Sequence, residues 1–440
     1  MIKINFWVWK SLSNEQKEKL ISRSDTDITK AMQAVIPILE SVKKRKDKAL
    51  IEFTKKFDKA DISKRPIKVT EQEYTDAEKK LDKGVKKAIE FSIANVVKFH
   101  KKQVPENMSN LKILPGITAA ERFLPIDSAG LYVPSGRGSF PSMLYMLAVP
   151  ALVAGVSRVC ITTPPNTEGN VDPACLFAAK VCEITEVYRI GGAQAIAALA
   201  FGTESIKPVV KITGPGSIYV TAAKRALYGK IDVGVPAGPS DSIVLADEKS
   251  DPYRAALDLM IEAEHGSDSA ALLVTDSKNL AESVKKHLDS IIETIPEPRK
   301  KFLCDVFSGY GGIILAKDMN EAAEIVNLYA PEHLQIATRD QTRALKLIRN
   351  AGEILLGQDT PFSIANYTTG PNAVIPTGGM AKTYSPVSVR DFMKSSSIIY
   401  ADKKGLESVA DHVIALADYE GFSAHSGALK MRNQTPGAQS

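Results

Sequence analysis

Residues 131–163 read LYVPSGRGSFPSMLYMLAVPALVAGVSRVCITT, and this stretch decides the fold class. The runs Leu131–Val133 and Val159–Thr163 are short, apolar and rich in β-branched residues, which is typical of strands. The apolar residues 142–156 between them contain Pro150 and are too few to span a membrane, so they predict a buried helix. A strand, a helix and a second strand in this order predict a unit of a parallel sheet.

The same alternation continues toward the C-terminus in two blocks. In the first block the expected strands after residue 163 are 186–190, 209–213 and 242–246, and the expected helices are 172–182, 193–201 and 218–228. In the second block the expected strands are 270–275, 312–316, 334–337 and 353–356, and the expected helices are 252–265, 280–295, 320–329 and 342–350. Two such blocks predict an α/β fold with two Rossmann-like parallel-sheet domains. Residues 1–115 and 405–429 show helical periodicity and predict N-terminal and C-terminal helical segments, whereas residues 361–400 are expected to be irregular.

The composition is that of a soluble globular protein with several domains. Of the 440 residues, 44% are hydrophobic and 24% are charged. The net charge of +5 arises from Lys and Arg spread along the chain, and the run Lys43–Lys46 lies in a helical stretch of mixed charge. We therefore expect no nucleic-acid partner and no membrane association.

Cysteine usage indicates a reducing compartment. The four cysteines, Cys160, Cys175, Cys182 and Cys304, form no C-x-x-C pair and no metal-ligand spacing, and Cys160 lies in an apolar strand-like run that is typical of a core. The first residues lack a basic stretch followed by an apolar one, so no signal peptide is expected. These features favour a cytoplasmic protein.

Three glycine-rich turns follow predicted strands of the first block. They are PSGRGS at 134–139, GGAQ at 191–194 and GPGS at 214–217. None is a complete G-x-G-x-x-G motif, and a tight turn without a ligand explains each one equally well. Three such turns at strand-to-helix junctions of one sheet favour dinucleotide binding along a single sheet edge.

The stretch Ile261–Gly266, IEAEHG, ends the predicted helix at 252–265 and carries a candidate metal pair. Glu262 and His265 are three residues apart and share one helix face. A carboxylate and an imidazole so placed supply half of a tetrahedral zinc site. The alternative is a surface carboxylate beside a histidine that caps the helix C-terminus.

A second polar pair, Glu332 and His333, lies in the sequence APEHL at a predicted helix-to-strand turn. An imidazole next to a carboxylate can act as a general base and activate water near neutral pH, although a capping pair is the alternative. His425 lies in the C-terminal helical segment, whereas His287 and His412 lie within amphipathic helices and are expected at the surface.

Taken in order, the motifs resemble the histidinol dehydrogenase family over roughly residues 25–430. The motifs that carry the resemblance are GLYVP at 130–134, GGAQAIAALA at 191–200, GPGSIYV at 214–220, PAGPS at 236–240, AEHG at 263–266, APEHL at 330–334, GPNAVIPT at 370–377 and SVRDFMK at 388–394. The resemblance implies a zinc- and NAD-dependent enzyme that oxidises a small polar primary alcohol to a carboxylate in two hydride transfers. It also implies a homodimer in which the C-terminal arm of one subunit completes the active site of the other.

The resemblance assigns domains and functional residues to this chain. The implied domains are an N-terminal helical segment (1–24), a zinc- and substrate-side Rossmann-like domain (25–117 with 237–380), an NAD-binding Rossmann-like domain (118–236) and a C-terminal dimerisation arm (381–440). The implied functional residues are His333 as base and Glu332 as water activator; Tyr132, Gln194 and Ser217 for NAD; Ser240, Glu420 and His333 for substrate; and Glu262, His265, Asn366 and His425 for Zn²⁺.

Four positions depart from the family's histidinol pattern. Glu262 replaces its usual glutamine, Asn366 its usual aspartate, Ala373 the histidine after G-P-N, and Ser217 an asparagine that contacts NAD. The first two changes compensate each other, since the ligand set still contains one carboxylate and every side chain still offers an oxygen or nitrogen atom. We therefore expect zinc to be retained.

The loss at Ala373 favours a substrate other than histidinol, because removing a hydrogen-bonding partner redirects specificity. A sulfonated diol such as 2,3-dihydroxypropane-1-sulfonate is one candidate, since relatives of this family oxidise it. The alternatives are a true histidinol dehydrogenase and a catalytically silent metabolite-binding relative. A metal-dependent hydrolase is disfavoured by the nucleotide-type alternation of strands and helices.

Overall fold

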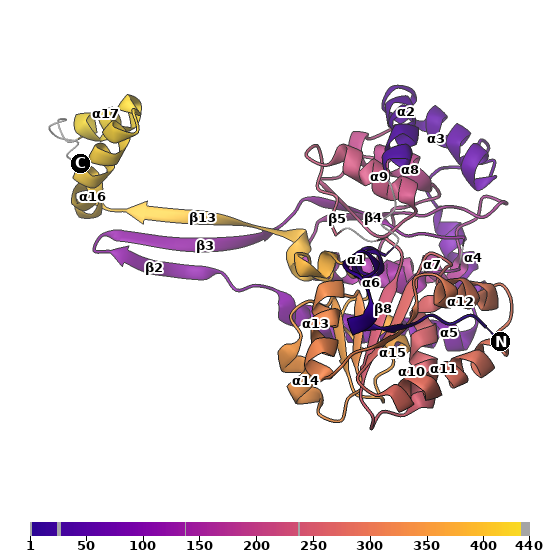
Figure 1. The fold of residues 1–440 in the computed structure, drawn as a ribbon. Coiled ribbons are helices and arrows are strands. Elements are labelled where there is room, and N and C mark those ends of the chain that lie inside the picture. The colour runs from indigo at the N-terminus through magenta and orange to yellow at the C-terminus, as the bar shows by residue number, and fades with distance from the viewer. Residues whose placement is uncertain (1, 24–27, 137, 236–237, 433–440) are drawn as a thin grey trace. The chain divides into compact units, whose positions relative to one another are not determined.

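A computed structural model describes residues 2–23, 28–136, 138–235 and 238–432 (Figure 1). Arg137 of the first glycine-rich turn and residues 236–237 of the PAGPS motif lie outside the described residues. The chain forms two compact units, a main unit of Met1–Val104 with Ile126–Phe392 and a second unit of Pro105–Pro125 with Met393–Ser440. The two units are compact parts of the fold, whereas the predicted domains are assigned by the ligand or partner that each binds. The predicted domain ranges therefore stay a prediction.

The larger sheet of the main unit is parallel throughout and has the strand order β1-β10-β9-β8-β11-β12. Its strands are β1 (Phe6–Val8), β8 (Asp241–Ala246), β9 (Ala270–Thr275), β10 (Gly312–Leu315), β11 (His333–Ile336) and β12 (Glu353–Leu356). Strand β8 ends the first alternating block in the sequence but pairs with the strands of the second block. Both of its neighbours in the sheet, β9 and β11, come from that block.

Helices cover both faces of this sheet (Figure 1). They are α10 (Pro252–Ala263), α11 (Lys278–Ile292), α12 (Arg299–Ser308), α13 (Met319–Tyr329), α14 (Gln341–Leu347) and α15 (Phe362–Tyr367). Val244 and Leu273 pack toward α10 and α11, whereas their neighbours Ile243 and Leu272 pack toward α13. Successive side chains thus enter opposite cores, which is why these strands appear in the sequence as continuous apolar runs.

The smaller sheet of the main unit is also parallel, with the order β6-β5-β4-β7. Its strands are β4 (Ser128–Tyr132), β5 (Arg158–Thr162), β6 (Val187–Tyr188) and β7 (Lys211–Thr213), and its helices are α6 (Pro141–Ala154), α7 (Pro173–Val181), α8 (Gly192–Phe201) and α9 (Ile218–Leu227). The buried helix predicted at 142–156 is confirmed as α6, and Cys160 is fully buried in β5. Two parallel sheets with flanking helices confirm the predicted α/β class.

The N-terminal segment is only partly helical. Its helices are α1 (Asn14–Ser22), α2 (Thr29–Arg45), α3 (Asp47–Phe53), α4 (Glu71–Lys80) and α5 (Lys83–His100), and α2 packs on α8 and α9. The helical prediction for residues 1–115 is wrong at β1, because Phe6–Val8 pair with β10 at the sheet edge. It is also wrong at Met108–Leu114, which form a strand of the second unit. In both places strand pairing overrides the local helical pattern, with the distant strand β10 for β1 and with the next strand, β3, for Met108–Leu114.

The second unit contains an antiparallel sheet and two helices. The sheet has the order β13-β3-β2, with β2 (Met108–Leu114), β3 (Ile117–Pro125) and β13 (Met393–Ala401), and the helices are α16 (Lys403–Tyr419) and α17 (Ser423–Arg432). The helices confirm the prediction for residues 405–429. The irregular structure predicted for residues 361–400 is wrong at α15 and β13, since β13 is held by nine successive pairs with β3.

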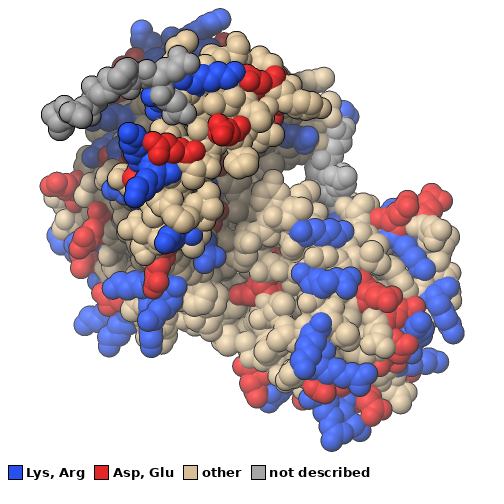
Figure 2. Space-filling view, turned by 90° about the vertical axis from the view of Figure 1, so that its left-hand side faces the viewer, with Lys and Arg blue, Asp and Glu red and all other residues tan. Residues whose placement is uncertain are grey.

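The surface carries both signs of charge. Figure 2 shows Lys and Arg side chains interspersed with Asp and Glu over the face that it draws, rather than gathered in one basic patch. Among the described residues, no helix combines the length and the apolar character needed to cross a membrane.

Candidate active site

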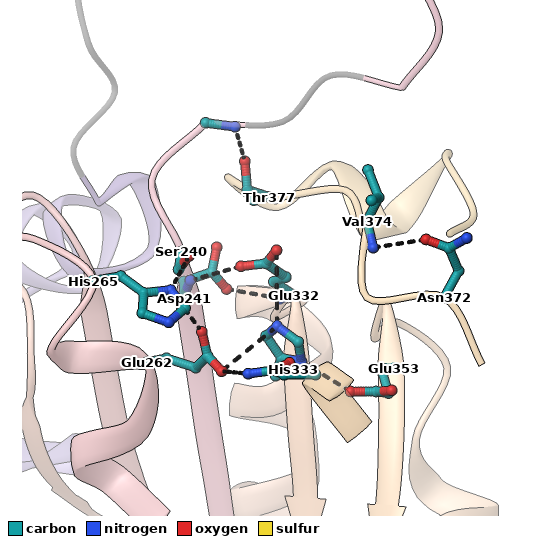
Figure 3. Close-up of polar contacts among 12 residues, drawn as sticks. Ser240, Asp241, Glu262, His265, Glu332, His333, Glu353, Asn372, Val374 and Thr377 are labelled. Carbon is teal, nitrogen blue, oxygen red and sulfur yellow. Dashed lines mark hydrogen bonds and ion pairs between the residues drawn. The ribbon is translucent and has the colours of Figure 1, made fainter. Parts of the chain in front are cut away.

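Three strands of the six-stranded sheet begin with a polar residue at the same edge. Strand β8 begins at Asp241, β11 at His333 and β12 at Glu353. The parallel register places His333 opposite Ser242 on one side and Glu353 on the other. The end of α10, with Glu262 in its last turn and His265 just beyond it, lies at this amino edge of the sheet as well (Figure 3).

Glu262 lies at the centre of this cluster, and its side chain is fully buried. Its carboxylate oxygens lie 3.2 Å from Nδ1 of His265 and 3.9 Å from Nε2 of His333. Asn366 Nδ2 donates a hydrogen bond of 2.7 Å to Oε1 of Glu262. Burial raises the pKa of Glu262, but the two imidazoles and the amide outweigh it and hold that pKa below its ordinary value.

His333 is held by a carboxylate that the sequence analysis did not identify. Its Nδ1 lies 2.9 Å from Oε2 of Glu353, and Phe362 packs edge-on against the ring at 5.7 Å between centroids. Glu353 follows His333 by twenty positions and looks like the start of an ordinary strand, so only the register between β11 and β12 identifies it. This bond fixes the tautomer of the imidazole and turns Nε2 toward Glu262 and Glu332.

The charges around His333 favour its protonated form. Burial lowers the pKa of His333, but Glu262, Glu332 and Glu353 together raise it to about 10. Glu332 is also buried, and burial raises the pKa of its carboxyl well above the ordinary value. A cation held by Glu262 would offset part of this negative charge and favour the neutral imidazole, which is the form that can take a proton from a substrate.

Ser240 completes the cluster at the start of β8. Its Oγ lies 3.0 Å from Nδ1 of His265, and Figure 3 shows the two side chains beside Glu262. The fold thus brings together six predicted site residues from distant parts of the chain, namely Ser240, Glu262, His265, Glu332, His333 and Asn366. The surface alternative for Glu262 is wrong, because its side chain is fully buried and both Glu–His pairs meet around it.

The glycine-rich turns lie at the carboxyl edge of the four-stranded sheet, as predicted, since they follow β4, β6 and β7. Tyr132 ends β4, and its hydroxyl accepts a hydrogen bond of 3.1 Å from the backbone N–H of Gly192. Gly214 has a φ of +120°, and a Cβ there would lie 2.1 Å from the carbonyl oxygen of Tyr132. Only glycine fits this close approach between two turns.

Gln194 is the strongest sign of a ligand at this edge. It is 1% exposed, and neither its amide nitrogen nor its amide oxygen has a hydrogen-bond partner among the described residues. Buried amides without partners are rare in folded proteins, so a bound molecule is expected to supply them. A cavity of about 850 Å³ lies beside the first turn, against Ser135 and Gly136. Ser217 is exposed at the start of α9, and its side chain makes no capping bond.

The two remaining candidates, Glu420 and His425, belong to the second unit. Glu420 follows the last residue of α16, His425 lies in the first turn of α17, and both are exposed. Their place relative to the cluster in the main unit stays a prediction.

Comparison with known proteins identifies the family. Residues 21–433 match the family model described as histidinol dehydrogenase. The chain belongs to the histidinol dehydrogenase family. It is 48% identical to the histidinol dehydrogenase of Synechocystis sp. over 421 residues, 96% of this chain and 97% of that protein. It is 48% identical to a histidinol dehydrogenase homolog of Colwellia psychrerythraea over 419 residues, 95% of this chain and 94% of that protein.

A solved structure of the family supports the fold. The crystal structure of histidinol dehydrogenase from Elizabethkingia anophelis matches with a TM-score of 0.93 and 32% identity, covering 99% of both chains. Histidinol dehydrogenases depend on NAD and zinc, oxidise a CH–OH group and are generally dimeric. This chain is therefore an oxidoreductase with those cofactors.

The residues around Glu262 fit a zinc ion. Oε2 of Glu262 is buried and has no hydrogen-bond partner within the described ranges, and the His265 ring lies against it. Asn366 binds Glu262 through its amide nitrogen, which leaves the amide oxygen for a cation. A carboxylate oxygen, an imidazole nitrogen and an amide oxygen are donors that zinc accepts. No three His, Cys, Asp or Glu side chains in the described part of the chain form a metal cluster by themselves, so Asn366 and a further donor are required.

Proposed function

We propose that this enzyme oxidises a small polar primary alcohol other than histidinol, such as 2,3-dihydroxypropane-1-sulfonate, to a carboxylate. Two NAD molecules are reduced for each substrate, and the aldehyde stays bound between the steps. The observation that carries the proposal is the meeting of Glu332 and His333 with the donors Glu262 and His265 at one sheet edge (Figure 3). The third donor, Asn366, binds Glu262 at 2.7 Å.

The chain's own side chains account for the proton transfers. Zinc, when bound, supplies a Lewis acid that polarises the substrate oxygen. His333 takes the alcohol proton at Nε2 while Glu353 holds Nδ1 and stabilises the resulting imidazolium. A hydride passes to NAD in the same step. Glu332 then takes a proton from a water molecule that adds to the aldehyde, and the hydrate gives the second hydride to a second NAD.

Ala373 supports a substrate other than histidinol. Its methyl group offers no hydrogen bond, whereas the adjacent Asn372 is committed to the backbone, donating 2.6 Å to the carbonyl of Met146. An imidazole-bearing substrate therefore loses a partner at this position. True histidinol dehydrogenase activity stays the second candidate, since the chain is equally similar to a named histidinol dehydrogenase and to a homolog.

The test is NADH production by zinc-loaded protein with L-histidinol and with a panel of small diols, sulfonated ones included. We expect a diol to yield two NADH per molecule while histidinol is inert. Two NADH from histidinol would establish the second candidate, and no turnover with any alcohol would favour a silent relative. His333→Asn serves as the control, because it removes the base while retaining a smaller polar side chain, and it should bind zinc without turnover.

The partner that we propose is a second copy of this chain, whose second unit supplies Glu420 and His425. Large apolar side chains in that unit are exposed in the single chain, including Ile399 (76%), Tyr400 (64%) and Tyr419 (91%). A monomer rarely exposes such residues together, and a symmetric dimer buries them.

Mixing two inactive variants tests this exchange. His333→Asn inactivates the main unit and His425→Ala the second unit, so a mixed dimer contains one site with both defects and one site with neither. We expect remixed subunits to recover about a quarter of wild-type activity, because half of the dimers are mixed and each has one intact site. If each chain builds its own site, remixing recovers nothing.

A further inference from the structure

Arg23, just after α1, is a buried cation that the mechanism above does not use. Its side chain is 5% exposed, and Nη1 lies 3.2 Å from Oδ2 of Asp241, whose side chain is 2% exposed. Nη2 donates 2.7 Å to the carbonyl oxygen of Tyr329, and the guanidinium lies 3.5 Å from the centre of the Tyr329 ring. Buried arginines are retained where their charge is compensated, so this one is tied to Asp241.

Asp241 binds Glu332 twice. Its Oδ1 accepts 2.8 Å from the backbone N–H of Glu332, and its own backbone N–H donates 3.1 Å to Oε2 of Glu332 (Figure 3). The other oxygen of Asp241 accepts 3.1 Å from the N–H of Gly378. Both the main chain and the carboxylate of Glu332 are therefore fixed by one residue.

The backbone that leads to Glu332 is strained. Ala330 has a φ of +50°, in the left-handed region that residues with a Cβ rarely adopt. The Nη2 of Arg23 lies 2.7 Å and 3.4 Å from the carbonyl oxygens of Tyr329 and Ala330, on both sides of this bend. The guanidinium thus holds the turn from which Glu332 extends.

His333 has a separate support. Its ring is hydrogen-bonded to Glu353 and packs against Phe362. The hydrogen bonds and ion pair of Arg23 go to Tyr329, Ala330 and Asp241 instead. The N–H of Glu353 also donates 2.9 Å to the main-chain carbonyl of Glu332, but the carboxylate of Glu332 is bound by Asp241. The side chains of Glu332 and His333 are therefore positioned by different groups. A change at Arg23 can displace one without the other.

We propose that Arg23 and Asp241 are positioning residues for Glu332, and that they serve the second half of the reaction only. This inference rests on the proposed function. In the first half, the alcohol and NAD⁺ give the aldehyde, NADH and a proton, with His333 as base. In the second half, the aldehyde, water and NAD⁺ give the carboxylate, NADH and two protons, and the water proton goes to Glu332. Loss of Arg23 should block the second half and release the aldehyde.

The experiment measures the two half-reactions separately. Arg23→Met removes the charge and keeps the aliphatic stem, Arg23→Lys keeps the charge, and Asp241→Asn keeps the shape. Each variant is assayed for NADH from the alcohol with hydroxylamine present to trap aldehyde, and for NADH from the aldehyde supplied directly. For Arg23→Met we expect aldehyde oxidation to fall about 100-fold, the effect of losing a general base. We also expect one NADH per alcohol with trapped aldehyde, and partial rescue in Arg23→Lys.

A matched control separates positioning from folding. Arg189 is also buried, and it forms an ion pair of 2.6 Å with Glu73. It directly follows β6 of the four-stranded sheet, whereas Arg23 and Asp241 belong to the site at the six-stranded sheet. Arg189→Met should leave the ratio of the two half-reactions unchanged. The inference is overturned if Arg23→Met lowers both half-reactions equally, as a purely structural residue would. If the wild-type protein oxidises no alcohol, the proposed function fails instead, so the two failures are distinguishable.

Discussion

Exchanging the side chains of Glu262 and Asn366 tests whether these two residues act as a single unit. Asn366 donates 2.7 Å to the fully buried carboxylate of Glu262. Glu262→Gln removes the only formal charge from the predicted zinc donors. Asn366→Asp places a second carboxylate within hydrogen-bonding distance of the first. The double variant again contains one amide and one carboxylate, in exchanged positions.

The structure sets the magnitudes. Two carboxylates with oxygens 2.7 Å apart repel by about 6 kcal/mol at an effective dielectric constant of about 20. Proton uptake at pH 7 limits the loss of unfolding free energy in metal-free Asn366→Asp to about 4 kcal/mol. Glu262→Gln loses about 1 kcal/mol, because a neutral hydrogen bond replaces a charge-assisted one, and its zinc affinity falls by about 100-fold. The double variant should return to within about 1 kcal/mol of the parent.

Competition with a chromophoric chelator gives the zinc affinity, and thermal denaturation with and without chelator gives the stability. Zinc should raise the melting temperature of Asn366→Asp more than that of the parent. The control is another buried amide–carboxylate pair, Gln335 and Asp258, joined at 2.7 Å; exchanging them should alter stability and leave zinc affinity unchanged. Additive losses in the Glu262/Asn366 double variant would refute the reasoning, because coupled residues must show a recovery.

Three further predictions concern the cofactor side of the main unit. Glu73→Gln leaves Arg189, which is 1% exposed, without an anion and should cost about 3 kcal/mol at pH 7 in urea denaturation. Burial raises the pKa of Glu73, but Arg189 outweighs burial and lowers that pKa from 4.5 to about 2. The ion pair therefore stabilises the folded state fully above pH 4.5, and this stabilisation disappears as the pH falls toward 2. The unfolding free energies of parent and variant should converge there. Gln194→Leu should leave the melting temperature unchanged or raise it, since the Gln194 amide has no hydrogen-bond partner within the described ranges. The same variant should weaken NAD binding by about 10-fold in fluorescence titration, and an unchanged NAD affinity would contradict a cofactor role. Gly214→Ala should displace the turn next to Tyr132 and weaken NAD binding at least as much by the same titration, whereas normal affinity would show that the close approach is dispensable.

The sequence predicted the parts of the fold in which a local pattern and a buried environment agree. The strands of both parallel sheets are buried on two faces, so each shows as an apolar run between helical segments. Strand β1 was missed because it has three residues at a sheet edge, and it forms only by pairing with β10, some 300 positions away. Strands β2 and β13 were missed because most of their residues are exposed and carry no core-facing alternation.

The candidate site was predicted where its residues are neighbours in the sequence. Glu262 and His265 share a helix face, and Glu332 and His333 are adjacent, so spacing alone identified both pairs. Glu353 and Asp241 were not found, because each enters the site through the register between strands that lie far apart in the chain. Sequence spacing carries no information about register, and family resemblance alone supplied Asn366.

Strand β1 and Arg23 make residues 6–23 part of both the large sheet and the candidate active site. A truncated chain that begins at Met32 would lack both features. It would leave the edge of β10 with unpaired backbone groups, which promotes aggregation, and would remove the cation beside Asp241. Residues 6–23 therefore serve two ends at once, since they cover a sheet edge and supply a charge next to the candidate active site.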